Sequence, residues 1–243
     1  MSLWLTNLPS WVTFVLVLGV SSAIALAATF LARGWYGSRG VTCGPAVVSS
    51  WATCIGALVA VMSAFTVITL WGVFARAQSN LDTETGAIRL ASRDIAPSQL
   101  PLLKAYISAT AAAWPRMCGG TPEPRVTALL KKLERVAKPR APEYANNLFQ
   151  QLTTMEEMRA ERWHGAYATA PPELKITLSI MALTLFGVLA IAMPERRDTH
   201  VALTLLVAFA IGAVFWVMIE LAYPYCGSVS ISPEQILRAL DYR

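Results

Sequence analysis

Four long apolar runs, at residues 11–32, 47–75, 176–193 and 201–223, constrain the fold of this 243-residue chain most strongly. They contain no Asp, Glu, Lys or Arg except Glu220, near the end of the last run. A bilayer core about 30 Å thick is spanned by about 20 apolar residues in a helix. Inside hydrocarbon each backbone N–H and C=O must be satisfied within its segment, so the runs should be helices. We therefore expect an all-α, multi-pass membrane protein.

The composition supports this interpretation. Hydrophobic residues make up 55% of the chain, charged residues only 14%, and the mean hydropathy is +0.49. These values lie outside the range of soluble domains. The net charge of +5 does not indicate nucleic-acid binding, because Lys and Arg are spread through polar segments that also carry acids. The expected surroundings are a lipid bilayer.

The runs are paired around a polar central segment, which predicts two hairpins of transmembrane helices and a helical extramembrane domain. The expected parts are a first hairpin at 1–76, an extramembrane domain at 77–173, a second hairpin at 174–226 and a tail with a short amphipathic helix at 227–243.

Basic residues in the short loops predict the orientation of the chain. These loops carry Arg33, Arg39, Arg196 and Arg197, whereas residues 1–32 contain no Lys or Arg. The positive-inside rule then places the short loops in the cytoplasm and the termini and central domain outside. Other basic residues flank the membrane on the opposite side and weaken this asymmetry: Arg76, Arg89, Arg93 and Lys175.

Which cysteines can form a disulfide depends on the same topology. Cys118 and Cys226 share one side of the membrane in any four-helix arrangement, while Cys43 falls in a short loop and Cys54 inside the second run. If the central side is oxidising, Cys118–Cys226 is the pair that can bond without crossing the membrane. The alternative is two unpaired thiols.

The second run predicts the most informative helix. From Pro45 to Arg76 it would be about 48 Å long, more than the bilayer core, and we expect it to continue outside through Asp82 and Glu84. Its small residues Gly56 and Ala60 favour close helix packing.

Side chains of this helix are candidates for a pore. Ser63 and Thr66 belong to a face rich in hydroxyls that either lines water or bonds to its own helix carbonyls. The bulky candidates, expected to form a constriction or to pack behind it, are Phe65, Trp71 and Phe74.

Two carboxylates are candidate functional residues. Glu84, repeated by symmetry at the exit of a pore, would form a ring of negative charge that favours cations. Glu220 lies within a membrane run, where an ionisable group is either functional or reaches the interface.

The central segment shows helical periodicity. Apolar residues recur at Leu148, Leu152 and Met155, on one face of a long helix. The charged residues that follow predict a solvated opposite face rather than a binding patch: Glu156, Glu157, Arg159, Glu161 and Arg162.

No catalytic motif or zinc-ligand spacing occurs in the sequence. The two histidines, His164 and His200, are expected on opposite sides of the membrane. We therefore expect no enzyme activity, no bound metal and no cofactor.

The tail after the last run carries a family resemblance. It contains Pro224, Gly227, Ser232, Pro233 and Glu234, and Tyr106 and Trp114 stand where relatives have a Tyr and a Trp-Pro. This pattern is similar to the DUF4239 or bestrophin-like domain family of bacterial membrane proteins. Ala222 and Gly86 depart from it, because relatives have Asp and Asn there. Any function of that Asp is then lost or taken over by Glu220.

The resemblance implies a fold like that of bestrophins, which are pentameric anion channels. It predicts a homo-oligomer, most simply a pentamer, in the bacterial inner membrane, conducting small ions through a pore lined by the second helix. The alternative is a non-conducting scaffold or accessory subunit that binds a protein through its central domain.

Overall fold

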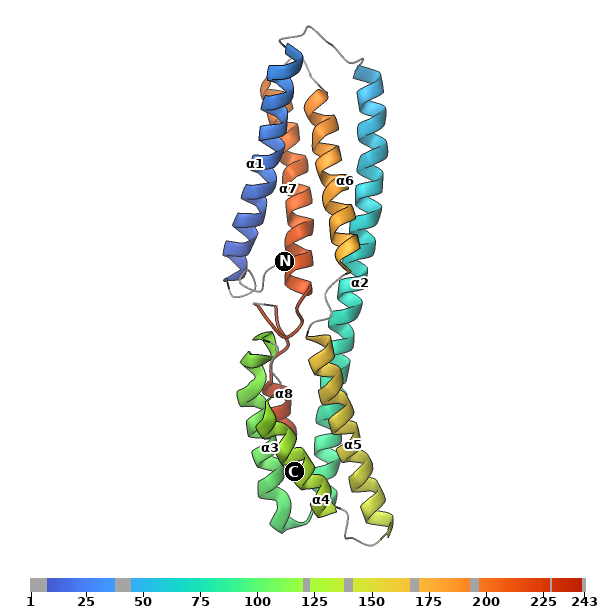
Figure 1. Cartoon of the computed structure of the whole chain (residues 1–243), viewed down its shortest axis with the longest axis vertical. Coiled ribbons are helices and arrows are strands. Elements are labelled where there is room, and N and C mark those ends of the chain that lie inside the picture. The colour runs from blue at the N-terminus through green and yellow to red at the C-terminus, as the bar shows by residue number, and fades with distance from the viewer. Residues whose placement is uncertain are drawn as a thin grey trace. The chain divides into compact units, whose positions relative to one another are not determined.

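The computed structural model describes residues 8–37, 45–119, 123–137, 142–166, 171–192, 197–227 and 229–241. These residues form helices and connecting turns, with no strand among them, which confirms the predicted all-α fold (Figure 1). The α-helices are α1 (Ser10–Gly37), α2 (Pro45–Asp94), α3 (Leu100–Ala113), α4 (Pro124–Ala137), α5 (Pro142–Gly165), α6 (Pro172–Ile191), α7 (Arg197–Leu221) and α8 (Glu234–Leu237). Short 3₁₀ helices are η2 (Pro97–Gln99), η3 (Trp114–Gly119) and η4 (Arg238–Leu240).

Four of these helices are long and apolar enough to cross a membrane, as predicted. The candidate spans are Ser10–Trp35, Ala46–Asp94, Pro172–Ile191 and Arg197–Leu221. α2 is continuous over 50 residues, so it extends well beyond its apolar run and carries both Asp82 and Glu84.

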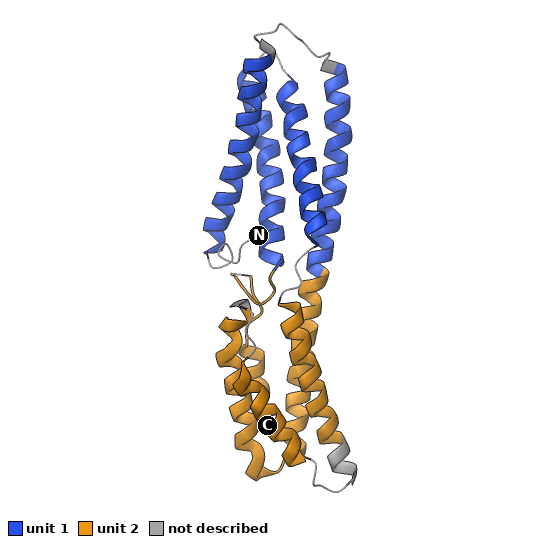
Figure 2. Cartoon of the chain, viewed as in Figure 1, with its two compact units in different colours: residues 1–71, 169–222 blue, residues 72–168, 223–243 orange. Residues whose placement is uncertain are grey.

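The chain divides into two compact units (Figure 2). Unit 1 comprises residues 1–71 and 169–222, and contains α1, the first part of α2, α6 and α7. Unit 2 comprises residues 72–168 and 223–243, and contains the rest of α2, α3, α4, α5 and the C-terminal tail with α8. α2 is therefore shared between the two units.

Unit 1 is a bundle in which α1 packs along α6 and α7. Its core uses small residues beside large ones, so that side chains interdigitate: Ala25, Val59, Ala182, Leu185, Phe186, Ala208 and Ile211. Phe14 of α1 meets the rings of Phe209 and Trp216 of α7 edge-on, with ring centroids 6.2 and 5.1 Å apart. This geometry is favourable for aromatic pairs.

A polar contact joins three helices of unit 1. Arg33 of α1 donates from Nε and Nη2 to His200 Nδ1 of α7, at 3.3 and 3.0 Å. Because Nδ1 accepts, the ring proton lies on Nε2, which donates to the Leu189 carbonyl of α6 at 2.9 Å. Buried His200 therefore has both nitrogens paired.

Unit 2 has its own apolar core. The buried stripe Leu148, Leu152 and Met155 of α5 matches the predicted apolar face. Leu130 and Leu133 of α4 are buried as well, and α4 packs against both α3 and α5.

The close approach of α1 and α7 generates a prediction. A Cβ on Gly212 would lie 2.8 Å from Leu18 Cδ2 and 3.4 Å from Leu18 Cα. We expect Gly212→Val to lower the free energy of unfolding in detergent micelles by about 1–3 kcal/mol, because overpacking displaces α1. Gly187→Val on α6 is the matched control, since a Cβ there meets nothing within 4 Å. Equal losses in the two variants would contradict this account.

Candidate functional site

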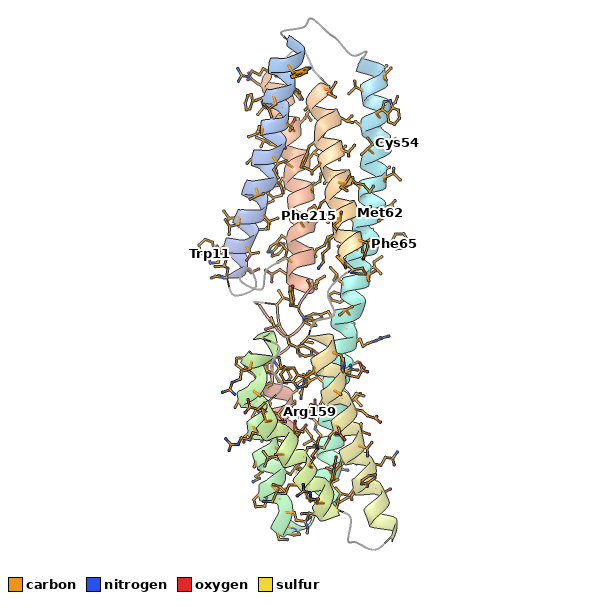
Figure 3. The ribbon with its side chains drawn as sticks, viewed as in Figure 1. Trp11, Cys54, Met62, Phe65, Arg159 and Phe215 are labelled. Atoms are coloured by element: carbon orange, nitrogen blue, oxygen red, sulfur yellow. The ribbon has the colours of Figure 1, made fainter. Side chains whose placement is uncertain are left out.

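The first part of α2 carries an exposed apolar stripe. Leu58, Val61, Phe65 and Ile68 are all more than half exposed. Their spacing of three, four and three residues puts them on one side of the helix. Phe65 points away from the other helices of unit 1 (Figure 3). This side of α2 is free to contact lipid, a second copy or a pore.

The opposite side of α2 carries small residues and faces its own bundle. Gly56, Ala60 and Ser63 line an apolar groove of about 720 Å³ within unit 1. The other walls include Leu185 of α6 and Ile211 of α7. Ser63, a predicted pore residue, therefore lies on the groove side rather than on the exposed stripe.

The hydroxyl groups of α2 distinguish between the two alternatives that the sequence left open for them. Thr66 is buried, and its Oγ1 donates to the Met62 carbonyl at 2.7 Å. Thr53 and Thr69 likewise donate to carbonyls four residues earlier, at 2.9 and 2.8 Å. The alternative of internal satisfaction thus holds for these residues, and Thr66 is not available to line a pore.

The aromatic candidates do not share one side of α2. Phe65 and Phe74 are nine residues apart, which turns them to opposite sides of a helix with 3.6 residues per turn. Phe65 and Trp71 are exposed, whereas Phe74 is half-buried. Of the three, only Phe65 belongs to the exposed stripe.

Unit 2 contains a buried ion pair between α2 and α5. Arg162 Nη1 lies 2.7 Å from Glu84 Oε2, and both side chains are at most 3% exposed. Arg162 Nη2 also donates to Glu84 Oε1 at 3.2 Å, so the guanidinium faces the carboxylate with two nitrogens. Tyr106 of α3 donates its hydroxyl to the same Oε1 at 3.0 Å.

Aromatic side chains extend this cluster to the C-terminal tail. The Arg162 guanidinium lies 4.9 Å from the ring centroid of Trp114, a favourable cation–π distance. Trp114 Nε1 donates to the Ile231 carbonyl at 2.9 Å. The Trp114 ring meets Tyr225 edge-on at 5.7 Å, and Tyr225 donates to the Ala77 carbonyl at 3.4 Å. We call Glu84, Tyr106, Trp114, Arg162 and Tyr225 the buried cluster.

The two tyrosines of the buried cluster act as donors. Burial and the neighbouring Glu84 carboxylate raise the pKa of Tyr106. Burial raises the pKa of Tyr225 to about 12. Both hydroxyls therefore keep their protons at neutral pH and can donate as the geometry requires.

The motif residues of the C-terminal tail determine the conformation of the segment that the buried cluster contacts. Ile231 N donates to the Pro224 carbonyl at 2.8 Å, which closes the tail on itself. Gly227 has a φ of 92°, in the left-handed region where a Cβ is unfavourable. Ser232 Oγ accepts from Glu234 N at 3.3 Å beside Pro233, and Glu234 pairs with Arg238 at the surface. These motif residues thus set the conformation of the tail.

Glu84 and Arg162 correct two further predictions. Glu84 is fully buried within its own unit, so its carboxylate cannot form an exposed ring at a pore exit. Arg162 was expected on a solvated face, yet it is buried, while Glu156, Glu157 and Glu161 are exposed as predicted. Its position seven residues after Met155, on the buried stripe of α5, was the signal for burial.

Glu220 belongs to unit 1, whereas the residues of the buried cluster belong to unit 2. Its Oε1 accepts from Ser10 Oγ at 2.8 Å, which joins the end of α7 to the start of α1. Glu220 is half-buried. Ala222, where the resemblance leads us to expect an Asp in relatives, is buried.

The cysteines were expected to pair as Cys118–Cys226. Cys226 is buried and disulfide-bonded, whereas Cys54 is a free thiol. The side chain of Cys118 lies outside the described residues, so this pairing stays a prediction. In the described part of the chain, no three His, Cys, Asp or Glu side chains are grouped as a metal site would require.

The hydrogen bonds of the two tyrosines generate a prediction. We expect Tyr106→Phe to lower the free energy of unfolding by about 1.5–3 kcal/mol, because it removes a bond to a charged group. Tyr225→Phe is the control, with an expected loss of about 1 kcal/mol or less, because its bond is long and its acceptor neutral. Chemical unfolding in mixed micelles measures both. A loss for Tyr225→Phe as large as that for Tyr106→Phe would be inconsistent with a charged Glu84.

Comparison with known proteins identifies the architecture. Solved structures with the same fold include a bacterial bestrophin homologue from Klebsiella pneumoniae in a mutant form, with a TM-score of 0.70 and 14% identity over 95% of this chain and 97% of that one. Another structure of a K. pneumoniae bestrophin homologue has a TM-score of 0.67 and 15% identity over 93% and 96% of the two chains. A mutant described only as a membrane protein has a TM-score of 0.68 and 14% identity over 94% and 97%.

Comparison with curated proteins found no match. The family model of the Bestrophin-like domain, however, matches residues 19–236, most of the chain. This match confirms the predicted resemblance to bestrophin-like proteins, and the four apolar helices agree with a multi-pass membrane protein. The chain belongs to the Bestrophin-like family.

Proposed function

We propose that the chain is one subunit of a homo-oligomeric ion channel whose pore is lined by the first part of α2. The observation that carries this proposal is the exposed stripe of Leu58, Val61, Phe65 and Ile68 on a helix of the Bestrophin-like family. In a ring of subunits, most simply a pentamer, these side chains would repeat around the axis. Small ions would pass through the rings.

The stripe supports an apolar constriction rather than a charged filter. Residues 47–75 contain no charged side chain, and the carboxylate of Glu84 is occupied by Arg162 and Tyr106. Narrow apolar segments control conduction by losing water. The largest side chain of the stripe, Phe65, is the residue that we expect to set the width.

Oligomerisation would also use the groove side of α2. The groove beside Gly56, Ala60 and Ser63 is apolar and about 720 Å³ in volume, so α2 is not fully packed within one copy of the bundle. Small residues allow close contact between helix backbones in a membrane. The groove therefore supports assembly with further copies or lipid.

The alternative function is a scaffold that binds a protein through unit 2. The observation in its favour is the exposed acidic edge of α5, with Glu156, Glu157 and Glu161. Conduction separates the two functions, because a scaffold needs no pore.

Replacement of Phe65, the residue proposed to form the constriction, generates a prediction. We expect Phe65→Ala to raise single-channel conductance severalfold in planar bilayers, because a wider ring of smaller side chains stays hydrated. Phe149→Ala is the control, since Phe149 is an exposed aromatic residue of α5 outside the stripe. Native mass spectrometry in mild detergent should show a ring-sized homo-oligomer for all three proteins. A folded oligomer that carries no current would favour the scaffold, and a monodisperse monomer would contradict both the pore and the ring.

The orientation of the chain generates another prediction. We propose that the short loops are cytoplasmic and that unit 2 is extracytoplasmic, because of Arg33, Arg39, Arg196 and Arg197. A single cysteine at Ser38, which lies outside the described residues, should be protected from impermeant thiol reagents in intact cells. A cysteine at Glu123 should be labelled. The opposite labelling pattern would place unit 2 in the cytoplasm and remove the reason to expect an oxidising environment for Cys226.

A further inference from the structure

The exposed side of α4 in unit 2 is positively charged. The other side of this helix is apolar and buried, with Val126, Leu130 and Leu133. The one acid of α4, Glu134, is half-buried. The cations of the helix are all exposed, on the side opposite the apolar one: Arg125, Lys131, Lys132 and Arg135. We call these four residues the basic face.

The exposed side of α5 carries the opposite charge. Glu157 and Glu161 are both exposed, and their spacing of four residues puts them on one side of the helix. The two arginines of α5 do not neutralise them. Arg162 is buried, and Arg159 is half-buried and donates to Thr127 of α4 at 2.9 Å. We call Glu157 and Glu161 the acidic face.

The two faces do not neutralise each other within one copy of the chain. α4 packs against α5, yet no ion pair among the described residues joins the basic face to the acidic face. The ion pairs in that part of the chain are formed by other side chains: Arg116 with Glu123, Glu84 with Arg162, and Glu234 with Arg238. The charges of both faces are therefore available to a partner.

A second copy of the chain is the partner that matches both faces. If α4 of one copy meets α5 of the next, each copy contributes one face of each sign. Such a head-to-tail contact uses two different surfaces of each copy, and it repeats around a closed ring. An anionic membrane surface would match the basic face alone and would repel the acidic face.

We propose that the basic face of α4 binds the acidic face of α5 in the neighbouring copy. This interface rests on the proposed homo-oligomer, but it does not depend on conduction. It would fix the alignment of neighbouring copies of unit 2, because alignments that bring like charges together are unfavourable.

Subunit exchange tests this interface with the full-length protein in mild detergent. Two preparations that carry donor and acceptor dyes are mixed, and energy transfer reports how fast copies exchange between oligomers. Reversal of the basic face by Lys132→Glu with Arg135→Glu should speed exchange at least about tenfold, because like charges then meet across the interface. Reversal of the acidic face by Glu157→Lys with Glu161→Lys should have the same effect.

A combined variant that carries all four substitutions separates an interface from a loss of folding. Its exchange rate should return to within about threefold of the parent rate, because opposite charges meet again with the two faces interchanged. Recovery in a variant that contains every substitution would show that none of them acts by unfolding the protein.

Two variants serve as matched controls. Lys104→Glu on α3 and Glu156→Lys on α5 each reverse an exposed charge outside the two faces, and both should exchange at the parent rate. The interface is overturned, while the ring stands, if the face variants exchange like these controls or if the combined variant does not recover. A parent protein that is monomeric by native mass spectrometry would overturn the ring and the interface together.

Discussion

The ion pair between Glu84 and Arg162 is the interaction on which unit 2 depends. Removing two charges from water is costly, and mutual attraction offsets this only when the geometry is good and further hydrogen bonds are made. Here the guanidinium faces the carboxylate with two nitrogens, Tyr106 donates to the carboxylate, and Trp114 covers the guanidinium. Burial of either charged side chain is therefore favourable only when the other charge, Tyr106 and Trp114 are also in place.

The contacts of the buried cluster also give particular residues of the C-terminal tail a structural role. Trp114 is held by the carbonyl of Ile231, and Ile231 in turn closes on Pro224. Gly227 supplies the positive φ that the turn between them requires. These tail residues thus act in folding: they hold the tail against the helices that carry the ion pair.

α2 carries both the side chains proposed to line the pore and one partner of the buried ion pair. Its first part carries the exposed stripe with Phe65, and its second part carries Glu84. One uninterrupted helix of 50 residues contains both. The proposed channel activity thus rests on one end of a helix whose other end is fixed by the buried cluster.

Much of the fold was predictable because a segment that crosses the hydrocarbon core of a bilayer must be apolar, about 20 residues long and helical. The four helices follow from the length of the apolar runs. Burial of charge was harder to predict, because Arg162 stands among Glu156, Glu157, Arg159 and Glu161, which resemble a solvated face. Helical periodicity contained the missing signal, since Arg162 follows Met155 by seven residues and Glu84 follows buried Leu81 by three. Periodicity also separates Phe65 from Phe74. The partner of each buried charge depends on tertiary packing, which no local pattern specifies.

A double-mutant cycle on Glu84 and Arg162 tests the central claim most directly. The free energy of unfolding of the full-length protein in mixed micelles would be compared for Glu84→Gln, Arg162→Met and the double variant. Each single variant should lose about 3–5 kcal/mol, because it leaves a buried charge without its partner. The double variant should lose much less than the sum of the two. Losses that add to within about 0.5 kcal/mol would show that the two side chains do not interact, and would contradict the account.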